Sequence, residues 1–149
     1  RHPKSGQACV IGAYLKILLV LLSRSATPVS SQDRNYDARF SVYEQFMKAL
    51  ELRFREHWPV RQYAERLGLT ESRLNRLCQK FAGQNALQII HGRVITEAKR
   101  KLIYADLSVN EVAYELGFKD PAYFSRFFTK HCEEAPGQFK KRLREKGGT

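Results

Sequence analysis

Side chains that can read base pairs gather on one face of a predicted helix that begins after Thr70. Arginine can bond both acceptors of guanine, and asparagine or glutamine can bond adenine in the same bidentate way. The opposite face carries Leu74, Leu77, Cys78 and Phe81 at the spacing of an α-helix. A solvated polar face is the ordinary alternative for such a helix. The base-reading residues predicted here are Ser72, Arg73, Asn75, Arg76 and Gln79.

A second polar face follows on a helix whose start is predicted by Asp120 as N-cap and Pro121 as first residue. Arg126 is its one strong base reader, whereas Ala122 and the methyl group of Thr129 suit contact with a thymine methyl. This helix is therefore expected to hold phosphates more than it specifies sequence. The base-facing residues predicted on it are Ala122, Tyr123, Ser125, Arg126 and Thr129.

Both helices lie in a segment that occurs twice, from Val60 to Ala86 and from Val109 to Pro136, with an offset of 49 residues before the turn and 50 after it. Each copy has the pattern of a short helix, a glycine turn and a second amphipathic helix. That pattern is typical of a helix-turn-helix. Two such units on one basic chain favour DNA as the partner. The equivalent pairs include Ala64 and Ala113, Gly68 and Gly117, Arg76 and Arg126, and Lys80 and Lys130.

The other elements follow from helix start and stop signals. Apolar residues at helical spacing predict a first helix over 42–55, and Ser108 with Glu111 forms a capping box. The spacing of Phe124, Phe127 and Phe128 predicts core positions in preference to base stacking. No segment alternates with period two. The expected fold is all-α with about seven helices: two helix-turn-helix subdomains at about 60–83 and 108–131, a long connecting helix at about 87–104, a last helix at 137–144, and an N-terminal apolar helix.

The connecting helix predicts how far apart the two units stand. Its 18 residues, at about 1.5 Å each, make a rod of about 27 Å. With the flanking turns, the two recognition helices could stand about 34 Å apart, one turn of DNA. One monomer would then enter two successive major grooves. Phosphate contacts are predicted for Lys80, Lys99, Arg100, Lys101, Lys130, Lys140, Lys141 and Arg142.

The composition favours a packed domain with an anionic partner. The net charge is +11, which suits a nucleic acid or a membrane surface, and 43% hydrophobic residues argue against global disorder. Three scattered cysteines predict reduced thiols and no disulfide scaffold. The motifs of nucleotide hydrolases, serine hydrolases and zinc proteases are absent from the sequence, and His57, His91 and His131 stand without partners at metal spacing. We therefore expect no enzyme, no cofactor and no metal site.

The N-terminal region is divided into an apolar run and a polar stretch. Residues 8–22 have three alternatives: a helix that packs on a partner or another domain, which we favour, a signal peptide, or a membrane span. The run is short for a span and contains Lys16, so we expect no stable membrane insertion. The Ser-rich residues 23–40 predict a flexible linker, and the folded domain is expected over 41–149. The first residue is Arg1, which favours a fragment or a processed product.

Residues 41–144 resemble the DNA-binding domain of the AraC/XylS family of bacterial transcription regulators. The most specific stretch is GFKDPAYFSRFFTKHCEEAPGQFK, residues 117–140, which is similar to the family's second helix-turn-helix signature. YAERLGLTESRLNRLCQKFAG, residues 63–83, matches the first signature, and EAKRKL, residues 97–102, matches the helix between them. The chain departs from the family at Cys78, usually Phe, at Glu133, usually Gly, and at Ala135, often Ser. Glu133 puts the turn after the second recognition helix in question.

The resemblance implies a transcription regulator, expected to be an activator, that acts on promoter DNA and RNA polymerase in the bacterial cytoplasm and nucleoid. It also implies an N-terminal sensor domain that this chain lacks, with residues 1–22 as a remnant of its closing helix. HWPVRQYAERLGLTESRLNRLC, residues 57–78, is similar to the subgroup that responds to hydroxyphenylacetate or hydroxybenzoate, so a small aromatic acid is the expected inducer. The alternatives are a non-specific basic protein of membranes or the nucleoid, and a truncated regulator without function.

Overall fold

The computed structural model describes residues 31–147, which fold into seven α-helices and one 3-10 helix without a strand. The expectation of an all-α fold with about seven helices is confirmed. The predicted apolar helix at 8–22 lies outside the described residues. In chain order the elements are α2 (Ser31–Arg53), η1 (Phe54–Glu56), α3 (Val60–Arg66), α4 (Glu71–Ala82), α5 (Ala86–Tyr104), α6 (Val109–Glu115), α7 (Pro121–Cys132) and α8 (Pro136–Gly147).

Side-chain caps explain where most of these helices begin. Thr70 accepts a hydrogen bond from Arg73 N at the start of α4, and Asp120 Oδ1 accepts one from Ala122 N at the start of α7. Ser108 begins α6 with the predicted capping box. A second capping box, in which Asn85 is the N-cap, begins α5. The helix starts marked by Thr70, Ser108 and Asp120 are therefore confirmed, whereas that of Asn85 is new.

Helix α2 corrects the predicted end of the linker. The linker was expected to reach residue 40, but the helix begins at Ser31 and continues without a break to Arg53. The later half of this helix is fixed by Phe46 and Leu50, which are buried in the core. Extending an existing helix adds one hydrogen bond per residue fixed, so polar residues can continue it away from the core. The flexible linker stays a prediction for residues 23–30, which lie outside the described part of the chain.

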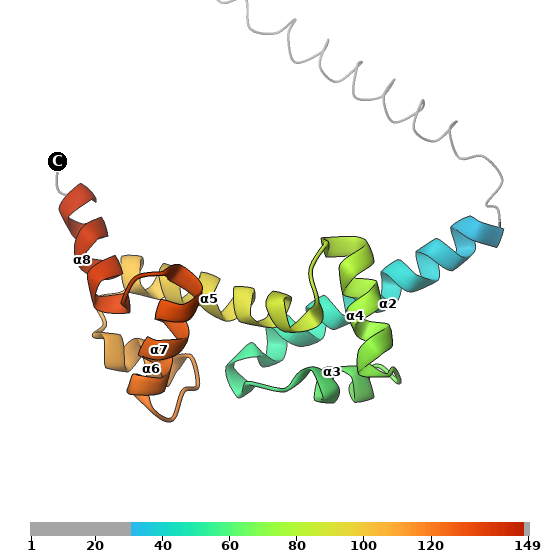
Figure 1. Ribbon diagram of the computed structural model, residues 1–149, viewed down its shortest axis with the longest axis horizontal. Coiled ribbons are helices and arrows are strands. Elements are labelled where there is room, and N and C mark those ends of the chain that lie inside the picture. Colours follow the sequence, from blue (N-terminus) through green and yellow to red (C-terminus); the bar gives the residue numbers. More distant parts are fainter. Residues whose placement is uncertain (1–30, 148–149) are drawn as a thin grey trace, which may run out of the picture. The chain divides into compact units, whose positions relative to one another are not determined.

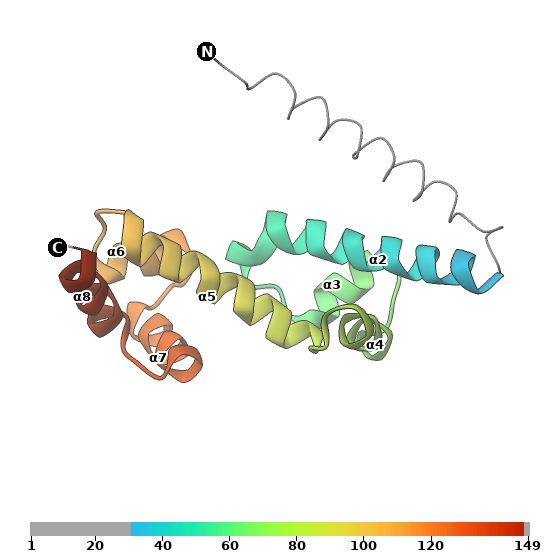
Figure 2. The ribbon, with the colours of Figure 1, turned by 90° about the horizontal axis from the view of Figure 1, so that it is seen from above.

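The two helix-turn-helix units pack against opposite ends of α5 (Figures 1 and 2). The first unit is α3 and α4, and the second is α6 and α7, with α8 packed on both α5 and α7. Helix α5 buries Ile90, Val94, Ala98 and Leu102, which recur every four residues along one side. This apolar stripe joins the cores of both units into one hydrophobic cluster. Residues Arg39–Thr149 accordingly form one compact unit.

The phenylalanines of α7 divide between the core and its edge. Phe124 and Phe128 are fully buried, as the spacing predicted, and Phe128 packs on Phe139 of α8. Phe127 is only partly buried: its ring lies against His91 and His131 at the margin of the core. The prediction of a core position is therefore confirmed for Phe124 and Phe128, and Phe127 packs against the core while staying partly exposed.

The turn that follows α7 keeps the glycine geometry without a glycine. Glu133 has φ 60° and ψ 9°, close to the φ 66° and ψ 14° of Gly83 at the equivalent position of the first unit. A non-glycine residue in this left-handed conformation costs about 1–2 kcal/mol. The Glu133 side chain is exposed, and Glu133 N donates to Thr129 O at 2.8 Å. The departure from the family pattern therefore leaves the turn geometry intact.

Candidate nucleic-acid interface

Helix α4 presents most of the predicted base-reading side chains to solvent. Its apolar residues Leu74, Leu77 and Cys78 are buried, which turns the opposite face outward. Burial raises the pKa of the Cys78 thiol to about 11, so this cysteine is an inert part of the core. Among the described residues, Arg76 has no ion-pair partner. The exposed residues of this face are Ser72, Arg73, Arg76, Gln79 and Lys80.

Asn75 differs from its neighbours on α4 because it is partly buried and already holds a partner. Its Oδ1 accepts a hydrogen bond from Ala86 N, the first residue of α5, at 2.9 Å. A bidentate contact with adenine uses both the oxygen and the nitrogen of the amide. The bond from Ala86 N occupies one of the two lone pairs of Oδ1, so this oxygen already has a structural role. Asn75 therefore ties the recognition helix to the connecting helix, a role that the sequence pattern did not indicate.

Helix α7 presents an equivalent face with fewer strong hydrogen-bonding groups. Ala122, Tyr123, Arg126 and Thr129 are exposed, and Ser125 is partly buried. The Ser125 hydroxyl donates to Pro121 O at 3.0 Å, and the Thr129 hydroxyl donates to Ser125 O at 2.8 Å. Both hydroxyl protons are thus spent within the helix, which leaves Arg126 as the strong donor. Arg126 Nη2 lies 3.7 Å from Asp120 Oδ2, an exposed contact that a base or phosphate could replace.

The eight side chains predicted to contact phosphate differ in exposure and in the groups that they contact within the chain. Lys101 is bound to Glu115 of α6, and Lys140 donates to the backbone oxygen of Leu107. These two side chains are largely withdrawn from solvent, so their charge mainly holds α5 and α8 to the second unit. Lys99 is partly buried, with Nζ 5.9 Å from the ring of Phe139. Two further cations pair with carboxylates, Arg100 with Glu97 and Arg142 with Glu134. The exposed members of the eight are Lys80, Arg100, Lys130, Lys141 and Arg142.

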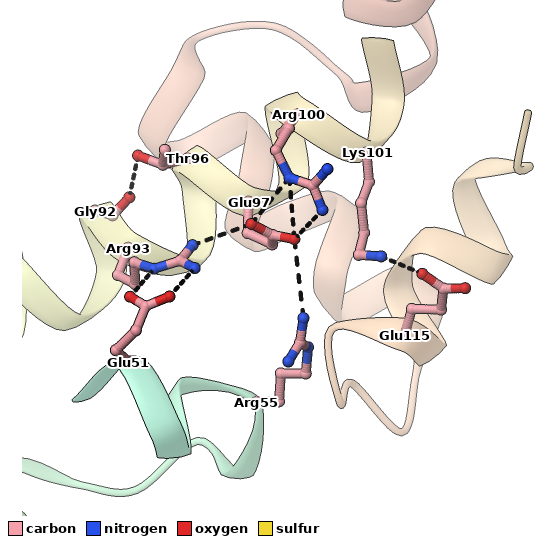
Figure 3. A network of polar contacts seen from close by, with 9 residues as sticks. All are labelled: Glu51, Arg55, Gly92, Arg93, Thr96, Glu97, Arg100, Lys101 and Glu115. Atoms are coloured by element: carbon pink, nitrogen blue, oxygen red, sulfur yellow. Dashed lines mark hydrogen bonds and ion pairs between the residues drawn. The ribbon is translucent and has the colours of Figure 1, made fainter. Parts of the chain in front are cut away.

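A carboxylate network that the sequence pattern missed joins α2 to α5 (Figure 3). Glu97 is buried, and its Oε1 accepts from Arg100 Nη2 at 2.6 Å while its Oε2 accepts from Arg93 Nη1 at 3.2 Å. Arg93 also makes a bidentate pair with Glu51 of α2, at 2.6 and 2.7 Å. Arg55 approaches Glu97 at 3.8 Å. One buried carboxylate therefore gathers three guanidinium groups at the junction of the two units.

Replacement of Glu97 by glutamine is expected to destabilise the fold in a pH-dependent way. Hydrogen bonds from Arg100, followed by those from Arg93, lower the pKa of Glu97 from 4.5 to about 2. A carboxyl with a lowered folded pKa stabilises the protein above its unfolded pKa and loses that contribution as the pH falls through the folded value. We expect Glu97→Gln to lower the free energy of unfolding by about 2 kcal/mol at pH 7, with Arg100 partly screened by solvent. The loss should shrink between pH 4.5 and about 2.

Denaturant titrations at pH 7 and pH 3 measure this difference. Glu65→Gln is the matched control, because the Arg61–Glu65 pair is 2.7 Å long but both side chains are largely exposed. The control should change the stability by less than about 0.5 kcal/mol. Equal stability of Glu97→Gln and the unchanged chain at pH 7 would contradict the structural role of Glu97.

His57 also has a role that the sequence did not reveal. The sequence pattern concerned only partners at metal spacing, whereas in the structure Nε2 of His57 lies 2.9 Å from the backbone oxygen of Leu116, at the turn of the second unit. Burial lowers the pKa of His57, so the ring is neutral at pH 7. Because a carbonyl oxygen only accepts, Nε2 carries the ring proton and donates it. The other two histidines named in the sequence, His91 and His131, lie side by side, with ring centroids 5.0 Å apart.

Two features are absent from the described residues, 31–147. Within this range, no three His, Cys, Asp or Glu side chains come together in a group that could hold a metal ion. None of the helices in the same range has both the length and the apolar character that a membrane span requires.

Comparison with known protein families identifies the repeated segment. The profile of a family described as a helix-turn-helix domain matches residues 63–142. The chain is 31% identical over 119 residues to the HTH-type transcriptional activator RhaS of Salmonella arizonae, covering 80% of this chain and 41% of that protein. It is 26% identical over 87 residues to the lactose operon transcription activator of Staphylococcus xylosus, covering 58% of this chain and 31% of that protein. The chain thus spans less than half the length of these relatives.

Solved structures agree with this result. The DNA-binding domain of the global transcriptional factor AdpA, solved in complex with a target DNA, is 26% identical and superposes with a TM-score of 0.62, covering 70% of this chain and 94% of that one. The C-terminal domain of the response regulator yesN from Fusobacterium nucleatum has a TM-score of 0.62 at 23% identity, covering 67% of this chain and 98% of that one. The second likeness shows the fold, and the first extends it to a domain that binds DNA.

Proposed function

Because this chain belongs to the helix-turn-helix family of AraC-type DNA-binding domains, we propose that it activates transcription by reading two successive major grooves with α4 and α7. The family itself supports the more general role of a DNA-binding transcription regulator. The reading of two grooves is supported by one observation: both recognition helices present an arginine, Arg76 and Arg126, on a solvent-exposed face. These residues occupy equivalent positions in the two repeats and lie at opposite ends of α5.

The length of α5 supports this geometry. Its 19 residues span about 29 Å at about 1.5 Å per residue. The buried stripe of α5 holds both units in one hydrophobic cluster, so their recognition helices belong to one body. Successive major grooves on one face of B-DNA are about 34 Å apart. A rod of this length with short flanking turns suits that distance.

The partners of the whole protein extend the proposal. We propose RNA polymerase as the second macromolecular partner and the bacterial nucleoid as the place of action, by analogy with the activators that share this domain. A small aromatic acid would act through a sensor domain outside this chain, as the resemblance of residues 57–78 suggests. Base contacts are proposed for the exposed residues of α4 and α7, and for the amide of the partly buried Asn75, whose Oδ1 also accepts from Ala86 N.

Selection of bound sequences from a random DNA pool tests this function. The same selection with Arg76→Ala tests whether Arg76 reads a base. We expect the unchanged chain to enrich a motif with two elements, and Arg76→Ala to lose preference at one base pair, with a cost of about 1–3 kcal/mol there. Arg61→Ala is the control, because Arg61 is an exposed arginine of α3 outside the recognition helices. It should leave the motif unchanged.

The alternatives give different outcomes in the same selection. A non-specific basic protein would bind the pool without enriching any motif, and a truncated regulator without function would not bind it. An Arg76→Ala motif identical to that of the unchanged chain would remove Arg76 from the base readers.

A further inference from the structure

The segment that precedes the first helix-turn-helix unit touches the second unit directly, in addition to the contacts that both units make with α5. Residues Arg55–His57, at the end of η1, lie against Leu116–Phe118, the turn of the second unit. We call these two segments the interunit clasp. The Leu116–Phe118 segment of the clasp leads into α7, whose first residue is Pro121. The position of the second recognition helix relative to the first unit therefore depends on how these segments fit.

The closest approach in the clasp is at Gly117. A Cβ atom on this residue would lie 1.9 Å from the backbone oxygen of Arg55 and 3.4 Å from His57 Nε2. The first distance is far below any real contact of a Cβ atom, and backbone cannot swing aside as a side chain can. Glycine is thus required at position 117 for two reasons. Its φ is +85°, and the backbone of Arg55 leaves no room for a Cβ atom.

His57 fixes the same contact with a hydrogen bond and a ring. Its Nε2 donates to Leu116 O at 2.9 Å, and its ring packs edge-on against Phe118 with centroids 4.3 Å apart. Phe118 is buried and contacts Phe124 of α7 at 5.2 Å. A continuous path of contacts therefore runs from η1 through His57 and Phe118 to the second recognition helix.

The first unit supplies an internal comparison for the glycine. Gly68 holds the equivalent place in the turn of the first repeat, with a φ of +64° against +85° at Gly117. A Cβ atom on Gly68 would meet nothing within 4 Å. Alanine at either position suffers the strain of a positive φ, but only at Gly117 does it also force the two units apart. Comparison of Gly68→Ala with Gly117→Ala therefore separates the effect of strain in the turn from the effect of a disrupted clasp.

We propose that the interunit clasp sets the number of base pairs between the two DNA elements, with Gly117 and His57 as its positioning residues. This inference rests on the proposed function, since spacing has meaning only for a chain that reads two elements. One added base pair moves the second element by about 3.4 Å and rotates it by about 36°. A fixed pair of recognition helices cannot follow that shift, whereas a loosened pair can.

The first experiment measures spacing with the full chain. The motif enriched by the unchanged chain is synthesised with one base pair inserted or deleted between its elements. We expect each change to lower the affinity of the unchanged chain and of Gly68→Ala about tenfold or more. For Gly117→Ala, and for His57→Leu, the penalty should fall to about threefold or less, or the optimum should move to another spacing. A Gly117→Ala penalty equal to that of Gly68→Ala would overturn the clasp, as would an unchanged chain that tolerates the insertion.

The second experiment needs no DNA and therefore separates failure of the clasp from failure of the proposed function. Residual dipolar couplings of the ¹⁵N-labelled chain report whether the two units share one alignment tensor. We expect one tensor for the unchanged chain and Gly68→Ala, and two for Gly117→Ala with both units still folded. One tensor in all three proteins would overturn the clasp. A pool without an enriched motif would overturn the proposed function, and with it the link between clasp and spacing.

Discussion

Replacement of Phe128 by alanine should lower the free energy of unfolding by about 3–5 kcal/mol, a large part of the total for a domain of this size. Phe128 is fully buried, and its ring lies 5.9 Å from Phe124 and 5.5 Å from Phe139, measured between centroids. Removal of the ring would open a cavity among α7, α8 and the core that these rigid neighbours cannot fill. DNA binding should be lost because the domain unfolds, and not because Phe128 of the recognition helix contacts DNA.

Thermal melting and DNA binding measured on the same samples test this prediction. Tyr123→Ala is the matched control, because Tyr123 is an aromatic residue of the same helix but is 57% exposed. It should melt close to the unchanged chain while altering DNA binding. A Phe128→Ala variant with an unchanged melting temperature and no DNA affinity would restore the alternative that this ring stacks on a base.

A steep dependence on salt is the other large effect that we expect. Each phosphate that a protein neutralises adds about −0.9 to the slope of log affinity against log salt. If both units dock together, the slope should be about −5 or steeper, which means a loss of several orders of magnitude on moving from low to moderate salt. The net charge of +11 and the exposed cations on both units support this expectation.

Two lysine variants make the salt experiment specific. Lys130→Gln removes an exposed cation of the second recognition helix and should make the slope shallower by about 0.9. Lys101→Gln removes a cation that is bound to Glu115 within the chain, so it should lower stability but leave the slope unchanged. A slope of about −2 for the unchanged chain would mean that only one unit engages the duplex.

The helices could be predicted well because the signals that define them are local. The capping box at Ser108 and the Asp120–Pro121 start depend on residues within one turn, and both are where the sequence placed them. Helix α2 shows the limit of this approach. Residues 35–41 of this helix are solvent-exposed, and the stretch around Ser31 has a composition typical of a linker, so no local signal indicated a helix there. The anchor for this helix lies further on, at Phe46 and Leu50.

The candidate interface could be predicted as a face but not as a set of free groups. Helical spacing correctly separated the buried side of α4 from its exposed side, although base reading by these residues stays a prediction. The intrachain partners of Asn75, Lys101 and Lys140 lie 11 to 33 residues away along the chain. The clasp partner of His57 is 59 residues away. Such pairings depend on how helices cross, which no local pattern specifies.

The unlike faces of α4 and α7 give the chain a direction. Helix α4, at one end of α5, carries Arg76 and Gln79, and α7, at the other end, carries Arg126 and Thr129 at the equivalent positions. No rotation exchanges these two ends, so a single copy has no symmetry that would require a palindromic site. A regulator built this way would bind its target site in one fixed orientation. Inversion of the target relative to a promoter would then be a different signal, because the same protein surface would face upstream where it had faced downstream.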